Sequence, residues 1–168
     1  MTTNNMINVP LSGNSGTGFF AGSNQPTINQ PLIVGVTNGS DAAAGDVGEI
    51  ITSNVPIGSA GSLTNNTPGN CTSISLMAGR WVIFGNVWFG ITGVSTYAQA
   101  WASLASATQP DLSLCAGVQT GTAGSVGMHI PFLIINLSSP NVVYLSGVCG
   151  FSTGTAGISG SIFALRIG

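Results

Sequence analysis

Charged side chains are almost missing from this sequence of 168 residues. They make up 4% of it, against about 25% in ordinary soluble domains, and none is a lysine. The formal net charge is −2, so the sequence offers no basic cluster of the kind that binds nucleic acid or an anionic membrane. A chain this close to neutrality tends to associate. We therefore expect other subunits to cover much of its surface; the alternative is a secreted protein with a Ser/Thr-rich sheet surface.

The side-chain combinations that catalysis requires are missing as well. The single histidine, His129, has the position of a half-buried strand residue, and no GxSxG or GK[ST] motif is present. The three cysteines are too widely spaced for a zinc site and odd in number for a disulfide framework, which favours buried free thiols. Asp46 and Glu49, the closest acidic pair, supply too few oxygen ligands for Ca²⁺. The sequence therefore predicts no enzyme, no cofactor and no metal site.

The segment "RWVIFGNVWFGITG" has no charge after its first residue, yet it is not typical of a membrane span. A spanning helix needs about 20 mostly apolar residues, whereas this stretch contains glycine and asparagine and is rich in β-branched and aromatic residues. We predict one or two long strands with no membrane insertion, covered by the core on one side and by a neighbouring subunit on the other. One face would carry Trp81, Ile83, Val87 and Phe89, and the other Val82, Phe84, Asn86 and Trp88.

An alternation of period two continues from about Gly45 to the end of the chain. Strand-like runs include "CTSISLMAG", "STYAQAWASLASAT", "MHIPFLIINLS", "NVVYLSGVCGFS" and "GISGSIFALRIG". Turn signals such as "NTPGN", "ATQPD" and "SSPN" separate them. The alanines of "YAQAWASLASA" leave a helical turn open there. Short strands at near-regular spacing predict an all-β fold, with residues 45–168 forming an antiparallel β-sandwich.

Residues 1–44 differ from the rest in being dense in glycine, asparagine, serine and proline. Such a segment cannot form a core alone. We predict an extended arm that becomes ordered against another surface; a disordered linker is the alternative. The segment has neither a basic n-region nor an apolar h-region, so no secretory signal is expected. Its clustered apolar residues are candidate docking points, namely Phe19, Phe20, Leu32, Ile33 and Val34.

Aromatic and arginine side chains are the remaining candidates for a binding surface. Trp88 has apolar neighbours that favour core packing. Tyr97 and Trp101 alternate with alanine, which leaves core packing and an exposed patch that stacks on glycans equally open. Arg80 and Arg166 either meet one of the few acidic residues, including one across a subunit boundary, or lie exposed at strand ends.

Taken in order, "GDVGEIITSNVP", "GSLTNNTPGNCTSISLMAGRWVIFGNVWF" and "VVYLSGVCGFSTGTAGISGSIFALRIG" resemble the short fibre and head or tail appendage proteins of tailed bacteriophages. The GTG-containing "PLSGNSGTGFFAGSNQPTINQPLIVGVTNG" also resembles repeats in such fibres. The resemblance covers most of the chain and lies in order and spacing. The matched positions before the closing part are Gly45, Gly48, Glu49, Ser62, Leu63, Thr64, Thr67, Pro68, Asn70, Thr72, Ser73, Ile74, Ser75, Leu76, Ala78, Gly79, Trp81, Val82, Gly85, Val87 and Phe89.

The resemblance implies a structural virion protein, a homotrimer whose sandwich head has jelly-roll character. Its arm, residues 1–44, would anchor it to other virion proteins of the capsid or tail, with the head outward and assembly in the host cytoplasm. An arm of this length reaches at most about 150 Å, which favours a short fibre or capsid decoration over a long fibre. The alternatives are a tail fibre module for host attachment, in which Tyr97 and Trp101 contact a host surface glycan, and a secreted bacterial lectin.

Overall fold

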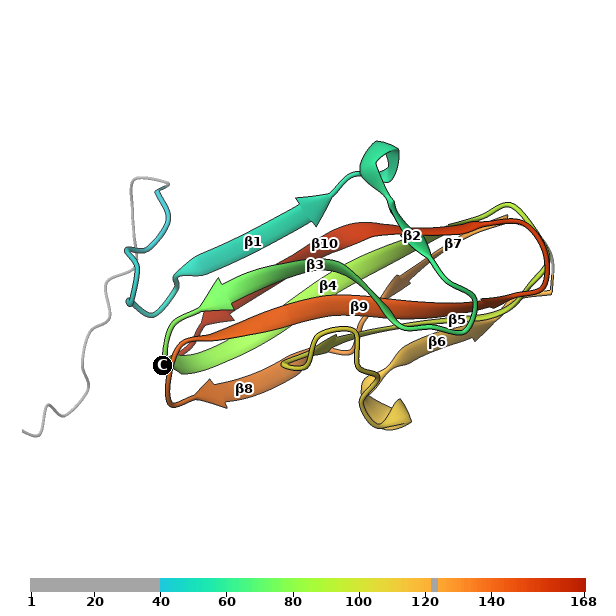
Figure 1. The fold of residues 1–168 in the computed structure, drawn as a ribbon. Coiled ribbons are helices and arrows are strands. Elements are labelled where there is room, and N and C mark those ends of the chain that lie inside the picture. The colour runs from blue at the N-terminus through green and yellow to red at the C-terminus, as the bar shows by residue number, and fades with distance from the viewer. Residues whose placement is uncertain (1–39, 122–123) are drawn as a thin grey trace, which may run out of the picture. The chain divides into compact units, whose positions relative to one another are not determined.

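Two antiparallel β-sheets face each other in the computed structural model, which describes residues 40–121 and 124–168 (Figure 1). Within these residues the chain forms ten strands and two short 3₁₀ helices. The strands are β1 (Ile50–Val55), β2 (Gly61–Leu63), β3 (Gly69–Leu76), β4 (Gly79–Ile91), β5 (Ser95–Ser103), β6 (Ala116–Gln119), β7 (Gly124–His129), β8 (Leu133–Leu137), β9 (Asn141–Phe151) and β10 (Ala156–Arg166). The helices are η1 (Ile57–Ser59) and η2 (Leu112–Leu114).

The strand order is that of a jelly roll. Sheet A has the order β1-β10-β4-β7, with β2 also pairing with β10 and β8 with β4, and sheet B has the order β3-β9-β5-β6. Strands β7 and β8 follow each other along the same edge of β4, so they act as one interrupted strand. The pairs β1–β10, β3–β9, β4–β7/β8 and β5–β6 are then nested, first with last, as in a jelly roll. The predicted all-β antiparallel sandwich of jelly-roll type is confirmed.

Strand β4 shows why these residues form a sandwich. Successive side chains of a strand point to opposite sides. In β4 the side chains of Trp81, Ile83, Val87, Phe89 and Ile91 are buried, whereas Phe84 and Trp88 are exposed. The same alternation in β3, β5, β9 and β10 fills the space between the sheets. The largest fully buried side chains of this core are Trp81, Phe89, Leu76, Ile83, Leu145, Ile158 and Ile162.

Turn signals mark the strand ends as expected. The segments "NTPGN", "ATQPD" and "SSPN" all fall between strands or at their first residues. The helical turn considered for "YAQAWASLASA" does not form, because its first seven residues belong to strand β5, where Ala98, Ala100 and Ala102 face the core. The division predicted between residues 44 and 45 stays a prediction, since residues 1–39 lie outside the described part of the chain.

Candidate functional site

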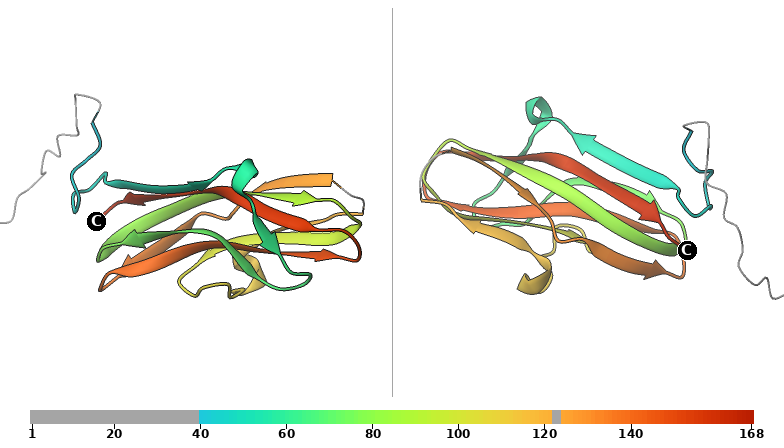
Figure 2. Two further views of the ribbon diagram at one scale, coloured as in Figure 1. Left: turned by 45° about the horizontal axis from the view of Figure 1, so that its top comes forward. Right: turned by 180° about the vertical axis from the view of Figure 1, so that it is seen from behind.

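The outward side of sheet A is the larger of two candidate surfaces, and we call it the open face. The right panel of Figure 2 views the molecule from the side of β10 and β4. Strand register arranges the outward side chains in rows that cross the sheet. The first row contains Ile50, Leu165, Val82 and Ile134, and the second Thr52, Phe163 and Phe84. A polar row of Asn54, Ser161, Asn86 and His129 follows, and then Trp88.

The open face is apolar and almost free of charge. Phe84, Phe163, Ile50 and Ile134 are 44–50% exposed, which is unusual for side chains of this size in adjacent rows. Ile50, Phe84, Phe163, Ala164 and Leu165 line a hollow of about 380 Å³. Within the described residues, the charged side chain on this side of sheet A is Arg80. It pairs in register with Asn136, beyond the first row.

Trp88 belongs to the open face and not to the core, so the interpretation of this residue as core packing is wrong. Its side chain is 40% exposed and lies over β7, where a Cβ at Gly127 would come within 2.7 Å of the indole ring. The apolar neighbours of Trp88 in the sequence are buried because they point the other way. The strand is apolar on both sides, as predicted, but within residues 40–121 and 124–168 only the side toward sheet B is covered.

The outward side of sheet B differs, because a loop of the chain covers it; we call it the covered face. Trp101 lies there, opposite Ser146 of β9, and is fully buried although it is not part of the core between the sheets. The segment 104–115 after β5 crosses this side of the sheet (Figure 1). Asn70 of β3 holds it: the Asn70 amide donates to Ser106 Oγ (2.7 Å) and accepts from the Ala107 N–H (2.7 Å).

The two aromatic residues considered for glycan contact, Tyr97 and Trp101, differ in their exposure. Trp101 offers no exposed ring face, so the glycan-contact interpretation does not extend to it. Its Nε1–H has no hydrogen-bond partner among the described residues. Tyr97, in contrast, is half-buried and lines an open cleft of about 840 Å³ between β5, β6 and the loop. Its hydroxyl donates to Asn66 Oδ1 at 3.1 Å.

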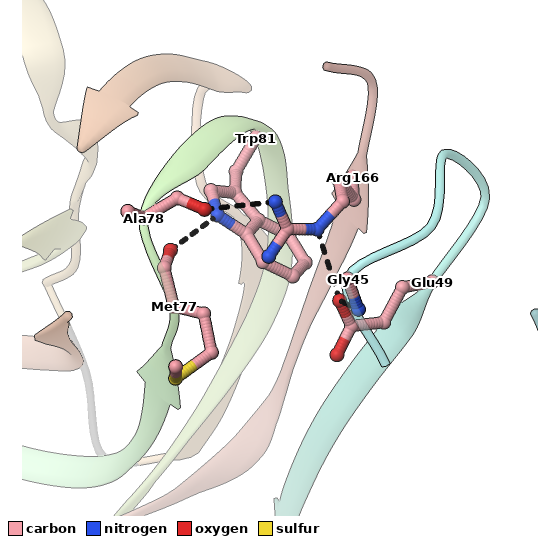
Figure 3. A network of polar contacts seen from close by, with 6 residues as sticks. All are labelled: Gly45, Glu49, Met77, Ala78, Trp81 and Arg166. Atoms are coloured by element: carbon pink, nitrogen blue, oxygen red, sulfur yellow. Dashed lines mark hydrogen bonds and ion pairs between the residues drawn. The ribbon is translucent and has the colours of Figure 1, made fainter. Parts of the chain in front are cut away.

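A buried ion pair closes one end of the sandwich (Figure 3). Arg166 Nε donates to Glu49 Oε2 at 2.9 Å, and Arg166 Nη1 donates to the Ala78 carbonyl at 2.8 Å. The guanidinium lies 4.5 Å from the centre of the Trp81 ring, a cation–π contact. Gly79, at φ +147°, is required beside it, because a Cβ there would collide with Arg166 Nη1.

Glu49 completes this network from the turn that precedes β1. Its Oε2 accepts from the Gly45 N–H at 2.9 Å, and its backbone carbonyl accepts from the Arg166 N–H at 2.9 Å. The Gly45 hydrogen bond lowers the pKa of Glu49, and the hydrogen bond and charge of Arg166 lower it further against the opposing effect of burial. Arg166 thus meets an acidic residue within the chain, whereas Arg80 is exposed at a strand end. The pair is enclosed, with side chains 6% and 8% exposed, and it joins the turn before β1 to the end of β10.

The remaining reactive groups are dispersed. Cys149 is buried in the core, Cys71 and Cys115 are half-buried, and all three are free. Burial raises the pKa of the Cys71 thiol to about 11, which leaves it unreactive at neutral pH. His129 is exposed, not half-buried, at the end of β7. Among the described residues, no group of three or more His, Cys, Asp or Glu side chains could hold a metal ion.

The predicted anchoring residues and the predicted lack of membrane insertion concern different parts of the chain. The candidate anchoring residues Phe19, Phe20 and 32–34 lie outside the described residues. In residues 40–121 and 124–168 no helix is long and apolar enough to cross a membrane.

Sequence reasoning missed the glutamines beside Tyr97, because nothing in the alternation of β5 indicates that Gln99 and the distant Gln109 meet.

No protein-family model matches the chain, and no curated protein matches it at a significant level. Among solved structures, one that is similar is a chain in the structure of infectious bursal disease virus, Gx strain, with 14% sequence identity and a TM-score of 0.45. The match covers 81% of this chain and 36% of that chain. This chain therefore spans about a third of the length of the viral chain. A likeness this distant carries no conclusion about function.

Proposed function

We propose that the protein is a non-enzymatic structural subunit of a virus particle, and that copies of it associate through the open face. The observation that carries the proposal is the double row of exposed apolar side chains on sheet A. Phe84 and Phe163 stand side by side in register at its centre. Burial of apolar surface contributes about 25 cal/mol per Å², so covering two such rows supplies much of the free energy of a subunit contact.

A second copy of this chain is the partner that the charges favour. Charged groups buried without an opposite charge are costly, and most protein surfaces carry many of them. Only six charged side chains exist in this chain, and two of them, Glu49 and Arg166, already neutralise each other. The open face of a second copy can therefore approach without desolvating an unpaired charge in the apolar rows.

The finer part of the proposal comes from the sequence resemblance to tailed-phage appendage proteins. It makes the assembly a homotrimer, either a short fibre or a capsid decoration, with residues 1–44 as the segment that attaches to other virion proteins. The jelly-roll strand order supports only the coarser role of a viral structural protein, because such folds are frequent among viral capsid and lectin domains. Fold alone does not determine function, so the test addresses the open face directly.

The test is the mass of the purified chain by light scattering and by sedimentation at micromolar concentration. We expect three times the chain mass of 16.8 kDa. The double variant Phe84→Ser/Phe163→Ser should raise the dissociation constant by about 100-fold or more, because central apolar residues dominate the energy of interfaces.

A matched control removes apolar surface elsewhere. Ile57→Ser/Val94→Ser changes two residues of η1 and the β4–β5 turn that are 68% and 49% exposed and lie off the open face. This variant should keep the trimer mass. A wild-type chain that stays monomeric at these concentrations, or a control variant that dissociates as readily as the test variant, would contradict the proposal. A stable dimer would retain the contact and refute the trimer.

A further inference from the structure

The cleft beside Tyr97 lies on the other side of the sandwich from the open face. Its polar lining consists of Thr96, Tyr97, Gln99, Gln109 and Gln119, and we call it the amide cleft. Its volume of about 840 Å³ falls within the range of small-ligand sites. Self-association through the open face does not explain it, because it is separate from the apolar rows of sheet A.

Glycines opposite two of the lining residues shape the floor of the amide cleft. Tyr97 pairs in register with Gly150 of β9, and a Cβ at that position would collide with the Tyr97 ring. Gln99 pairs with Gly117 of β6, where a Cβ would lie 3.2 Å from Gln99 Cγ. Each glycine therefore lets the larger side chain lie flat across the neighbouring strand. The Tyr97 ring rests against Gly150 of β9, and the half-buried side chain also lines the amide cleft.

A β-bulge brings the hydroxyl of Thr96 to the same place. The register of β5 with β9 shifts between Ser95 and Tyr97, so that one residue of β5 is unpaired. Such a bulge twists the strand and redirects side chains locally. Thr96 and Tyr97, although adjacent in sequence, consequently both line the amide cleft. Thr96 Oγ1 donates to the Gly150 carbonyl at 3.2 Å, which fixes its orientation.

The two central glutamines are oriented by each other. Gln109 Nε2 donates to Gln99 Oε1 at 2.6 Å, and this bond joins the loop to β5. Gln109 also lies within hydrogen-bonding reach of the Cys115 thiol. Among the described residues Gln99 Nε2 forms no further hydrogen bond, which leaves donor positions at the wall of the amide cleft. Gln119 adds a second exposed amide from the edge strand.

The chemistry of this lining selects a class of ligand. Amides and hydroxyls donate and accept, as the hydroxyl groups of a sugar do, and an aromatic face packs on the apolar face of a sugar ring. No charged side chain lines the amide cleft, so phosphate, sulfate and carboxylate groups would find no counterion, and nucleic acid would find no cation. An extended peptide could instead pair with the edge strand β6, which supplies Gly117, Val118 and Gln119 to the lining. The rest of the lining, from β5 and the loop, consists of amide, hydroxyl and aromatic side chains, which favours a sugar over a peptide.

We propose that the amide cleft binds a neutral glycan, with Tyr97 as the stacking platform and Gln99 and Gln109 as the hydrogen-bonding wall. The site lies within one chain and does not depend on the open face. Its failure and that of the proposed self-association are therefore distinguishable, since one is measured as glycan binding and the other as mass.

The experiment uses the full chain on an array of neutral oligosaccharides of glucose, galactose, mannose and N-acetylhexosamines, with their sialylated and sulfated counterparts and a panel of extended peptides. The best neutral binder is then titrated by calorimetry. Tyr97→Ala and Gln99→Ala should each weaken binding by about tenfold or more, a loss of about 1.4 kcal/mol. Tyr97→Phe keeps the ring and should retain most of the affinity.

Tyr144→Ala is the matched control, because Tyr144 is also half-buried and lies on the same side of sheet B as Ser146 but outside the amide cleft. We expect it to change affinity by less than about twofold, and circular dichroism of each variant checks the fold. The proposal is overturned if no neutral glycan binds, if charged glycans or peptides bind in their place, or if Tyr97→Ala and Tyr144→Ala weaken binding equally.

Discussion

The outward sides of the two sheets carry a tryptophan each, and these two tryptophans differ in their exposure to solvent. Trp101 on the covered face is fully buried beneath the chain's own loop, whereas Trp88 on the open face is 40% exposed. Both come from strands whose other side fills the core. The difference lies in segment 104–115, which crosses sheet B, while within the described residues no equivalent segment crosses the apolar rows of sheet A. Within the described residues, two of the four sheet surfaces therefore form the core, the loop covers the third, and the fourth is left uncovered.

The largest expected effect compares the two tryptophans directly. Trp101→Ala should lower the free energy of unfolding by about 3–5 kcal/mol, as for other buried aromatic residues. Trp88→Ala should lower it by about 1 kcal/mol, because much of the ring is already in water. Urea unfolding followed by circular dichroism measures both, in the Phe84→Ser/Phe163→Ser background so that association does not contribute. Equal losses would show that the loop does not protect Trp101 in solution.

A smaller effect is expected at the side chain that holds the loop. Asn70 forms three hydrogen bonds on the covered face, with Ser106, with the Ala107 N–H and with Ser146 Oγ. Asn70→Ala should cost about 1–2 kcal/mol, since these bonds are largely exposed. It should also increase quenching of Trp101 fluorescence by acrylamide, measured in a Trp88→Phe background that removes the exposed indole.

Asn86→Ala is the counterpart of that substitution on the open face. Asn86 accepts hydrogen bonds from the N–H and Oγ of Ser161, but it holds no loop. Its replacement should leave the quenching of Trp101 unchanged. If both asparagine variants increased quenching alike, the covering of Trp101 would depend on general stability and not on the anchor at Asn70.

The sequence contains enough information to predict the strands but not which of their sides are covered. Alternation in "CTSISLMAG" and in β4 is local, so the core side chains could be assigned correctly. Trp88 and Trp101 have the same local pattern, and their different burial depends on a loop whose sequence, "LASATQPDLSLC", indicates only turns. That loop is placed by Asn70, which is 36 residues away from its partner Ser106. Contacts over such separations are set by strand pairing, which alternation does not encode.

The partner of Arg166 in the buried ion pair was also not predictable from the sequence. The sequence indicates that Arg166 could pair with one of very few acidic residues. That the partner is Glu49 depends on the pairing of β1 with β10. Tyr97 could be recognised as a surface candidate, whereas the amide wall beside it could not. Gln109 reaches Gln99 only because η2 and the preceding loop fold back over β5.

The smallest expected effect is the loss of stability at low pH. It distinguishes a carboxylate at the end of sheet A, Glu49, from one on the loop of the covered face, Asp111. The pKa of Glu49 is lowered chiefly by the Gly45 hydrogen bond, and that of Asp111 by its hydrogen bonds with Ser113. A pKa lowered by folding contributes stability above the unfolded value, and this contribution is lost as the pH falls through the folded value. Stability should therefore decline below about pH 4.5, the ordinary value for Glu.

Glu49→Gln keeps the shape of the side chain and abolishes its titration. At pH 7 it should cost about 1 kcal/mol, because an amide still accepts from Arg166 and Gly45 but without charge assistance. Its unfolding free energy should approach that of the wild-type chain as the pH falls through the lowered pKa of Glu49, because Glu49 then becomes neutral as well. Asp111→Asn should change the acid dependence much less, because Asp111 is exposed and meets solvent in both states. Urea titrations at several pH values measure both variants. A larger effect at Asp111 than at Glu49 would contradict this prediction and would move the acid-sensitive point from the enclosed end of sheet A to the loop of the covered face.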